Sequence, residues 1–181
     1  MHRSQAELEA GLVEIDRSPG GQGSVVMIVI RPDRDLRRSL PFVELTPEAG
    51  MVGDRWLLHT NRLLPDGRLN PDTQLTLLNS RVAALIAGPQ ERWPLAGDNV
   101  VVDLDLGCDN LPVGTRLKIG EAEIEISAEP HTGCSKFSKR FGSAALKFVN
   151  SPHGKQRRLR GVYAWVVRGG RVSVADGIVK L

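Results

Sequence analysis

Glycine, proline and asparagine divide this chain into short apolar stretches, and the spacing of these turn-forming residues limits the folds that the chain can adopt. There are 19 glycines and 11 prolines in 181 residues. Runs of roughly four to eight β-branched and apolar residues between such breaks are typical of β-strands. The stretches that fit are 25–30, 74–78, 98–103, 116–119, 122–127, 161–167, 171–174 and 178–181, with further short strands expected within 44–58.

Two pairs of these stretches are predicted to form hairpins. Residues 116–119 and 122–127 alternate apolar and polar side chains around Gly120-Glu121, a pattern that favours a tight turn. Residues 161–167 and 171–174 flank Gly169-Gly170 in the same way. In the first hairpin, the side chains expected to face the core are Ala122, Ile124 and Ile126.

Helical patterns are few. Two or three short helices are predicted, over 1–11, 81–87 and the stretch 137–149 that Gly142 interrupts. The fold class is therefore mostly β, a closed barrel or a curled sandwich. Residues 24–181 are expected to form one barrel-like domain, with 1–23 part of it or appended to it. Neither a GxxxxGK[ST] loop nor a strand-borne GxGxxG occurs, so nucleotide-binding α/β folds have no support.

The expected location is the reducing cytoplasm. No apolar run approaches the ~20 residues that span a bilayer, and the acidic N-terminus lacks the apolar core of a signal peptide. Two cysteines, Cys108 and Cys134, do not resemble a disulfide framework, although one disulfide between them stays open as an alternative.

Charge is unevenly distributed along the chain. Residues 130–175 hold ten Lys and Arg and no Asp or Glu, whereas the rest of the chain holds 14 cations and 21 acids. Such polarity suggests an anionic partner, which could be a phosphate, an oxyanion or nucleic acid. The alternative is a solvated basic face opposite an acidic one.

Cys134 lies in this basic part, behind Gly133 and ahead of Lys136, Lys139 and Arg140. Cations stabilise a thiolate, which is the nucleophilic and metal-binding form of cysteine. A helix starting close after Cys134 would add the partial positive charge of its amides. We therefore expect a reactive thiol here, and the alternative is a buried inert cysteine.

Other interpretations of the cysteines have weaker support. Cys108 has no cationic sequence neighbours and is expected to be incidental. His131 and Cys134 have the spacing of a metal-ligand pair, but a structural zinc site needs four ligands, and no second pair is evident. A cysteine hydrolase would need a nearby histidine base, and the histidines show no hydrolase motif.

Several short motifs occur together in an order that resembles the MOSC domain, named after the C-terminal part of molybdenum cofactor sulfurases. The resemblance covers most of the chain, roughly 11–181. The motifs are Gly53-Asp54-Arg55, Gly97-Asp98-Asn99, Leu117-Lys-Ile-Gly120, the strand 122–127 leading to Cys134, Gly161-Val-Tyr-Ala164, Gly170-Arg-Val172 and Asp176.

The resemblance implies a β-barrel with a cysteine at the edge of a cationic pocket and either sulfur-carrier chemistry or a molybdenum-cofactor site. In relatives that reduce N-hydroxylated compounds the corresponding cysteine coordinates molybdenum, which by motif is Cys134. A soft thiolate suits that metal or a persulfide, and cations suit the pterin's phosphate. The candidate cofactor-binding residues are Arg55, Asn99, His131, Lys136, Arg140, Arg157, Arg158 and Arg160.

This sequence also departs from the family pattern. Gly133 stands where the family often has proline, Asp98 where it has glutamate, and Ala175 where it has glycine. The 181 residues include neither the pyridoxal-phosphate desulfurase domain of the full sulfurases nor an iron–sulfur module. A cysteine desulfurase or an electron-donor protein is therefore the expected partner, with a small molecule as substrate.

A non-catalytic binding module is the alternative function. Residues 130–171 would then form a surface for an anionic ligand or nucleic acid. Nucleic acid is the less expected ligand, because aromatics make up only 4% of the chain and none interleaves with Arg157-Arg158-Leu-Arg160 to stack on bases. Tyr163 and Trp165, on a predicted strand, are expected to pack in the core.

Overall fold

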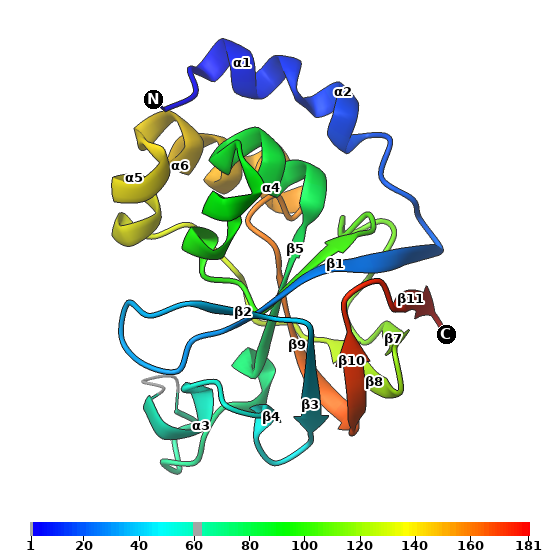
Figure 1. Ribbon diagram of the computed structural model, residues 1–181. Coiled ribbons are helices and arrows are strands. Elements are labelled where there is room, and N and C mark those ends of the chain that lie inside the picture. Colours follow the sequence, from blue (N-terminus) through cyan, green and yellow to red (C-terminus); the bar gives the residue numbers. More distant parts are fainter. Residues whose placement is uncertain (1, 60–62) are drawn as a thin grey trace.

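A closed barrel of β-strands forms the centre of the protein (Figure 1). The computed structural model describes residues 2–59 and 63–181. In spatial order, the larger sheet contains β11 (Gly177–Lys180), β7 (Arg116–Ile119), β8 (Ala122–Ile126), β9 (Val162–Arg168), β5 (Leu75–Asn79), β6 (Val100–Asp103), β1 (Gln22–Ile30) and β2 (Arg38–Leu40). Because β11 also pairs with β1, these strands close on themselves, and β2 extends beyond the closure.

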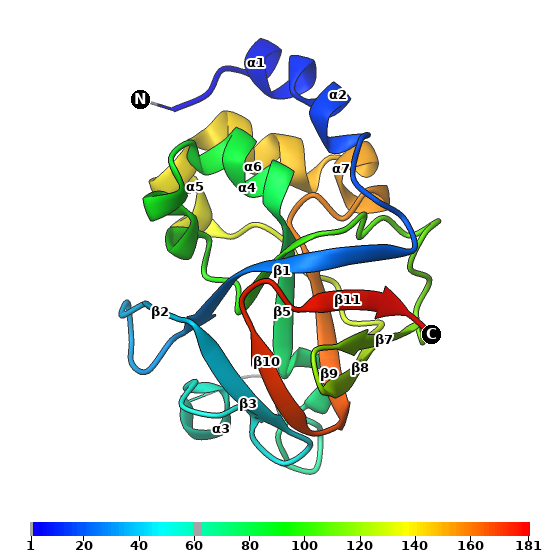
Figure 2. The same ribbon diagram turned by 45° about the vertical axis from the view of Figure 1, so that its right-hand side comes forward.

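The sheet is mixed. All its pairings are antiparallel except that of β5 with β6, which run parallel. A second sheet joins β10 (Gly170–Ser173), β3 (Phe42–Thr46) and β4 (Gly50–Met51), in the lower half of Figure 1 and of Figure 2, and its buried side chains join the core of the barrel. The mostly-β, barrel-like fold expected from the sequence is confirmed.

Helices gather mainly at one end of the barrel, at the top of Figures 1 and 2. The described residues contain α1 (Gln5–Ala10), α2 (Leu12–Ile15), α3 (Trp56–His59), α4 (Ser80–Ala87), α5 (Ser135–Phe141), α6 (Ser143–Asn150) and α7 (Pro152–Gln156), with 3₁₀ segments at Pro71–Thr73 and Gln90–Ala96. The expected number of two or three helices was therefore too low. Helices α2, α3 and α7 are only four or five residues long, too short to show a 3.6-residue apolar period.

Two apolar clusters stabilise the molecule. One fills the barrel, with side chains from its strands such as Ile28, Leu77 and Ile124 at or below 1% exposure. The other lies between the helices and the outer faces of β5 and β6. Leu8 and Phe141 are fully buried in it, so α1 and α5 are both held against the barrel. No helix in the described part of the chain is long and apolar enough to cross a bilayer.

Most local predictions hold. Strands β7 and β8 pair as a hairpin, and Ala122, Ile124 and Ile126 are buried as expected. Helix α4 is capped by Asn79, whose side-chain oxygen accepts hydrogen bonds from the backbone of Arg81 and Val82. Strand β1 begins at Gln22, so the boundary predicted between residues 23 and 24 lies within it. Both cysteines are free, so the alternative disulfide does not form.

The second predicted hairpin is wrong. Strand β9 lies between β8 and β5, whereas β10 leaves it after Gly169 and pairs with β3. The chain passes very close to other backbone at this corner. A Cβ on Gly169 would lie 2.8 Å from the carbonyl oxygen of Leu45, and one on Gly170 would lie 2.7 Å from the carbonyl carbon of Glu121. The two glycines therefore permit a crossing between sheets, not a turn between paired strands.

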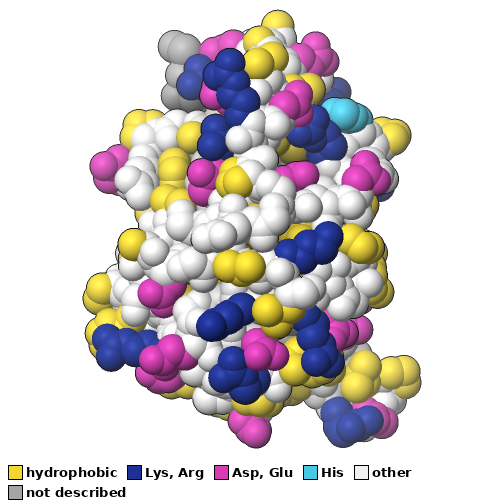
Figure 3. Space-filling model, turned by 90° about the vertical axis from the view of Figure 1, so that its right-hand side faces the viewer, with side chains coloured by type: hydrophobic (Ala, Val, Ile, Leu, Met, Phe, Trp, Pro, Cys, Tyr) yellow, Lys and Arg dark blue, Asp and Glu magenta, His cyan; other side chains and the backbone are white. Residues whose placement is uncertain are grey.

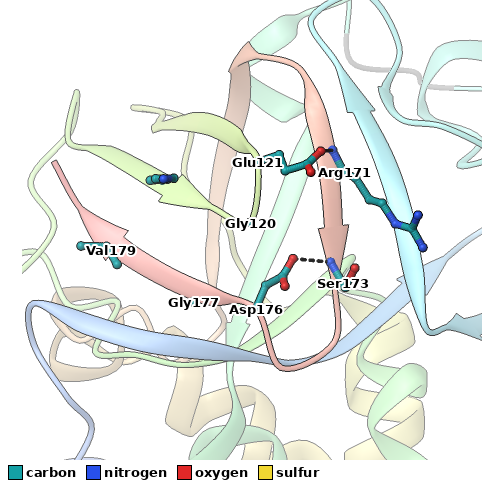
Figure 4. Close-up of a pocket in the computed structure, with 8 residues that line it drawn as sticks. Gly120, Glu121, Arg171, Ser173, Asp176, Gly177 and Val179 are labelled. Atoms are coloured by element: carbon teal, nitrogen blue, oxygen red, sulfur yellow. Dashed lines mark hydrogen bonds between the residues drawn. The ribbon is translucent and has the colours of Figure 1, made fainter.

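Figure 4 shows the surface hollow beside this corner. The backbone amide of Arg171 donates to the Glu121 carboxylate at 3.3 Å, and that of Ser173 donates to Asp176 at 2.7 Å. The hollow is lined by both signs of charge, with Lys118 and Arg171 opposed by Glu121 and Asp176. Three positions of the family resemblance, Gly120, Gly170 and Asp176, therefore build this corner of the fold and lie outside the cysteine pocket described below.

Replacement of Gly170 by alanine tests the crossing. The added Cβ meets backbone, so the strands have to separate, and we expect the free energy of unfolding to fall by about 1–3 kcal/mol, as at overpacked sites. Gly177→Ala is a matched control, because a Cβ there meets no atom within 4 Å. We expect that control to change stability by less than about 0.5 kcal/mol. Urea denaturation followed by circular dichroism measures both, and equal losses would contradict the steric explanation.

Candidate functional site

Cys134 lies at the start of helix α5. It is exposed, its backbone is extended, and it occupies the N-cap position. The loop before it is fixed to the end of α6 by two hydrogen bonds: Gly133 N–H donates to Asn150 Oδ1 at 2.8 Å, and Asn150 Nδ2 donates to the Gly133 carbonyl at 3.0 Å. Proline at position 133 would lack the first of these donors. Glycine stands here where the family often has proline, and its N–H is used in the hydrogen bond to Asn150.

The environment of Cys134 favours its thiolate. Partial burial raises the pKa of the thiol, but the backbone amides of Phe137 and Lys136 and the charge of Arg160 outweigh that effect, so the pKa lies below its ordinary value. The expected contribution of helix amides is therefore present, although the thiol makes no cap hydrogen bond. The charged residue with the largest effect is Arg160, which is distant in sequence, and not the neighbouring lysines.

The sulfur opens into a pocket of about 350 Å³. Among the described residues, six cations and no carboxylates line this pocket. The basic side chains come from three separate parts of the chain, and aromatic and hydroxyl groups complete the wall. The lining residues are Arg31, Arg37, Arg55, Trp56, Thr73, Thr76, Ala96, Gly97, His131, Thr132, Cys134, Lys136, Phe137, Arg140, Arg160 and Tyr163.

Arg31 is fixed at the pocket by Asp54. Its Nε and Nη2 donate to the two carboxylate oxygens at 2.9 and 2.8 Å, and the Asp54 side chain is 1% exposed. Asn99 lies behind the pair, donating to Asp54 at 3.0 Å and accepting from Arg31 at 3.2 Å. Burial lowers the pKa of Arg31, but Asp54 outweighs it and holds that pKa above its ordinary value. The guanidinium therefore stays charged.

A second buried pair fixes Arg160. Its Nη1 donates to both oxygens of Asp98, at 3.0 and 2.7 Å, and its Nη2 donates to the Ala96 carbonyl at 3.0 Å. The guanidinium also lies over the Phe137 ring, 5.1 Å from its centre. His131 Nδ1 is 3.6 Å from Asp98, and its ring packs 4.5 Å from that of Tyr163. The Asp98 carboxylate thus holds Arg160 by hydrogen bonds and lies close to His131.

Lys136 and Arg140 form the outer rim. Both contact the carboxylate of Asp35, at 3.2 and 3.3 Å, from the loop between β1 and β2. Arg140 also donates to the Leu95 carbonyl at 2.8 Å. Arg37 projects from the same loop and its Nε is buried without a hydrogen-bond partner. The rim is less fully neutralised than the inner wall.

The structure brings together most of the residues proposed from sequence. Arg55, His131, Cys134, Lys136, Arg140 and Arg160 line one pocket, and Asn99 supports it from behind.

Three basic residues lie elsewhere. Arg157 pairs with Asp16, and Arg158 donates to the carbonyls of Leu106 and Leu111, so both bind the chain's own N-terminal and loop segments. Lys139 is exposed and does not line the pocket. Closeness to Arg160 in sequence does not predict which basic residues line the pocket, because the side chains of this irregular segment point in different directions.

Sequence reasoning missed Arg31 and Arg37. The stretch RPDRDLRR at 31–38 carries a dense cluster of charge directly after a buried strand, and that signal could have indicated them. Trp56 also lines the pocket, and its Nε1 donates to Thr73 at 3.2 Å. Tyr163 is buried, as predicted, but also lines the pocket, and Trp165 is only half-buried.

The fold and this site together define a β-barrel protein with an accessible thiol in a cationic pocket. The family model for the MOSC domain matches residues 69–179. The chain therefore belongs to the MOSC domain family. The match includes Asp98, Cys134 and Arg160 but begins after Arg31 and Asp54. No curated protein matches the chain.

Solved structures share the fold. The YuaD protein from Bacillus subtilis superposes with a TM-score of 0.66 and 18% identity, over 87% of this chain and 94% of that one. YiiM from Escherichia coli gives a TM-score of 0.57 and 19% identity, over 87% and 69%. YiiM from Geobacillus stearothermophilus gives 0.60 and 16%, over 88% and 75%. At these identities the likeness extends to the fold alone.

The pKa of Cys134 has a direct kinetic readout. In a Cys108→Ser variant, which leaves one thiol, we expect the rate of alkylation by iodoacetamide to rise with a midpoint below the ~8.5 of a free peptide cysteine. The cause is the amides at the start of α5 together with Arg160. Alkylation rates across the pH range measure it. A midpoint equal to that of a cysteine peptide would refute the electrostatic description of the site.

Asp54→Asn tests the buried pair with Arg31. Burial raises the pKa of Asp54, but hydrogen bonds and charge from Arg31 outweigh it and hold the pKa below its ordinary value. Such a group stabilises the fold above its unfolded pKa of about 3.9, and this contribution is lost as pH falls through the folded value.

We therefore expect the free energy of unfolding of this variant to be about 3 kcal/mol or more below that of wild type near pH 7, because Arg31 is left buried without its counterion. The gap to wild type should begin to narrow below about pH 4 and continue to narrow towards the lower folded pKa, where the wild-type carboxylate also becomes protonated. Urea unfolding at both pH values measures it. The exposed Asp33→Asn is the control from the adjacent loop, and a gap independent of pH would be the contrary result.

Proposed function

We propose that this MOSC protein binds the molybdenum cofactor, or carries sulfur for it, through Cys134 in the cationic pocket. The observation that carries the proposal is the placement of one accessible thiol, with its pKa lowered, on the wall of a pocket lined by six cations and no carboxylate among the described residues. A soft thiolate and a set of fixed positive charges suit a ligand that has both a soft or sulfur-bearing centre and a phosphate.

The residues present fit such a cofactor. The described residues contain no cluster of three or more His, Cys, Asp or Glu able to hold a metal ion. A metal bound here would therefore have to bring ligands of its own, and the molybdenum of the cofactor does so through the sulfur atoms of its pterin. Cys134 would add one thiolate, Arg31 and Arg160 would present fixed charge, and Arg55, Lys136 and Arg140 would face the phosphate-bearing end.

In the sulfur-carrier role, the chemistry takes place at the Cys134 sulfur. Its thiolate attacks the outer sulfur of a persulfide on a cysteine desulfurase. The S–S bond forms at Cys134 as the donor's S–S bond breaks, and the donor leaves as a thiolate. The amides of Phe137 and Lys136 and the charge of Arg160 favour the ionised form of the attacking sulfur and would also stabilise the persulfide anion that the step produces.

In the reductase role, the bound cofactor supplies the two-electron chemistry, and the chain positions it. Cys134 would hold the metal and the arginines would fix the orientation of the ligand. Reduction of an N-hydroxylated small molecule would need an external electron-donor protein. In either role the cytoplasm is the expected location, since a reducing compartment keeps the thiol free.

A binding module without chemistry has less support. The cations of residues 130–171 do not share one surface. Arg157 pairs with Asp16 and Arg168 with Glu123, while Arg171 lies over the Phe42 ring, so several are engaged locally. Figure 3 shows the side of the molecule away from helix α5, and on this face basic and acidic side chains are interspersed. Nucleic-acid binding needs cations that are free to contact successive phosphates, and these three arginines already have partners within the chain.

Metal and pterin content test the proposal. Protein purified from cells competent for cofactor synthesis is expected to retain both, and Cys134→Ala is expected to lose the molybdenum, because the thiolate ligand is gone. Cys108→Ser is the matched control and should retain both. In parallel, incubation with a cysteine desulfurase and cysteine should place a persulfide on Cys134, detected by mass spectrometry. Absence of molybdenum, pterin and persulfide from wild-type protein would eliminate the function proposed here.

A further inference from the structure

The loop between β1 and β2 places one of the chain's own carboxylates against the pocket rim. Arg31 and Arg37 from this loop line the pocket, and Asp35 lies between them with a positive φ of 60°. Asp35 Oδ1 contacts both Lys136 Nζ and Arg140 Nη2, at 3.2 and 3.3 Å. These partners are 101 and 105 residues away in sequence, so the contact joins the loop to helix α5.

Asp35 neutralises this rim only in part. Its single charge is shared by Lys136 and Arg140, and its other oxygen lies 3.9 Å from Arg34. Arg37 Nε is buried without a hydrogen-bond partner. Burial and the nearby charges of Arg140 and Arg31 lower the pKa of Arg37, and they outweigh the opposing charges of Asp35 and Asp54. An additional negative charge at this point would relieve that repulsion.

We propose that Lys136, Arg140 and Arg37 form a subsite for the dianionic phosphate of a phosphate monoester, and that the Asp35 carboxylate occupies its place in the free protein. The inference rests on the proposed function, since it assigns the phosphate-bearing end of the ligand to the rim of the Cys134 pocket. A phosphate has three acceptor oxygens and can bond Arg37 as well as Lys136 and Arg140.

The exchange also explains how the site would select its ligand. Asp35 and Lys136 are more than half exposed, and exposed ion pairs contribute little to stability, so Asp35 can be displaced at low cost. A monoanion such as acetate brings no more charge than the carboxylate it displaces and gains little. A dianion adds one negative charge to an under-neutralised group of cations. The subsite should therefore discriminate by charge.

Calorimetric titration of the full chain with glycerol 3-phosphate tests the assignment, at a pH where the ester is dianionic and with acetate at matched ionic strength as comparison. We expect wild-type protein to bind the phosphate more tightly than acetate. Asp35→Asn should tighten phosphate binding about three- to fivefold, because the internal competitor is removed. Arg37→Gln should weaken it about tenfold, through loss of a charged donor.

Two further variants keep the test decisive. Asp33→Asn removes the same charge from the same loop but has no contact with the rim, and should leave the affinity within about twofold of wild type. Lys136→Gln changes an exposed side chain and should weaken binding even if Arg37→Gln fails to fold. Equal affinity for phosphate and acetate would overturn the subsite. So would equal tightening by Asp33→Asn and Asp35→Asn, or the absence of any effect of Arg37→Gln and Lys136→Gln on phosphate affinity.

The two proposals can fail separately. Phosphate binding that follows the expected order of variants, in a wild-type protein that retains no molybdenum or pterin, would support the subsite and remove the cofactor. Molybdenum retention that depends on Cys134, without any response of phosphate affinity to Asp35 or Arg37, would support the cofactor and overturn the subsite.

Discussion

The pocket depends on two buried carboxylates that hold arginines in place. Asp54 fixes Arg31 and Asp98 fixes Arg160, each through two short hydrogen bonds from the guanidinium. Two unpaired guanidinium groups could not remain charged and ordered at this depth, because burial of an uncompensated charge is costly. Asn99 lies against the first pair and directly follows Asp98 in sequence. The positive charges around Cys134 are therefore held in place by buried carboxylates that do not themselves line the pocket.

The helical layer sets the position of the sulfur. Phe137 and Phe141 bury one face of α5 in the outer apolar cluster, and the bonds between Gly133 and Asn150 fix the loop that enters it. The start of α5 is thus held at the pocket wall, with its first amides close to the thiol. The contacts that bury the apolar face of α5 therefore also place the Cys134 thiol at the pocket wall.

Sequence reasoning recovered most of the barrel and the main elements of the site. Alternation identified the hairpin of β7 and β8, and the cations near Cys134 in sequence predicted a basic environment for the thiol, which the pocket lining confirms. An anionic ligand stays a prediction. Sequence reasoning failed where tertiary contacts determine how strands pair and where side chains lie. Gly169-Gly170 has the composition of a hairpin turn, but only the approach of Glu121 reveals a crossing. Arg157 and Arg160 look equivalent in sequence, yet their counterions, Asp16 and Asp98, separate a surface contact from the pocket wall.

The walls of the pocket come from distant parts of the chain, and this has a consequence for the order of assembly. Arg31 and Asp54 are 23 residues apart, whereas Arg160 and Asp98 are 62 apart and Arg140 and Asp35 are 105 apart. A chain still emerging from the ribosome possesses Arg31 and Asp54 long before Arg160, so the complete pocket can form only after Arg160 has been synthesised. A ligand that contacts Arg31 and Arg160 together would therefore bind only the folded chain and would raise its free energy of unfolding, because it would join segments that are far apart in sequence.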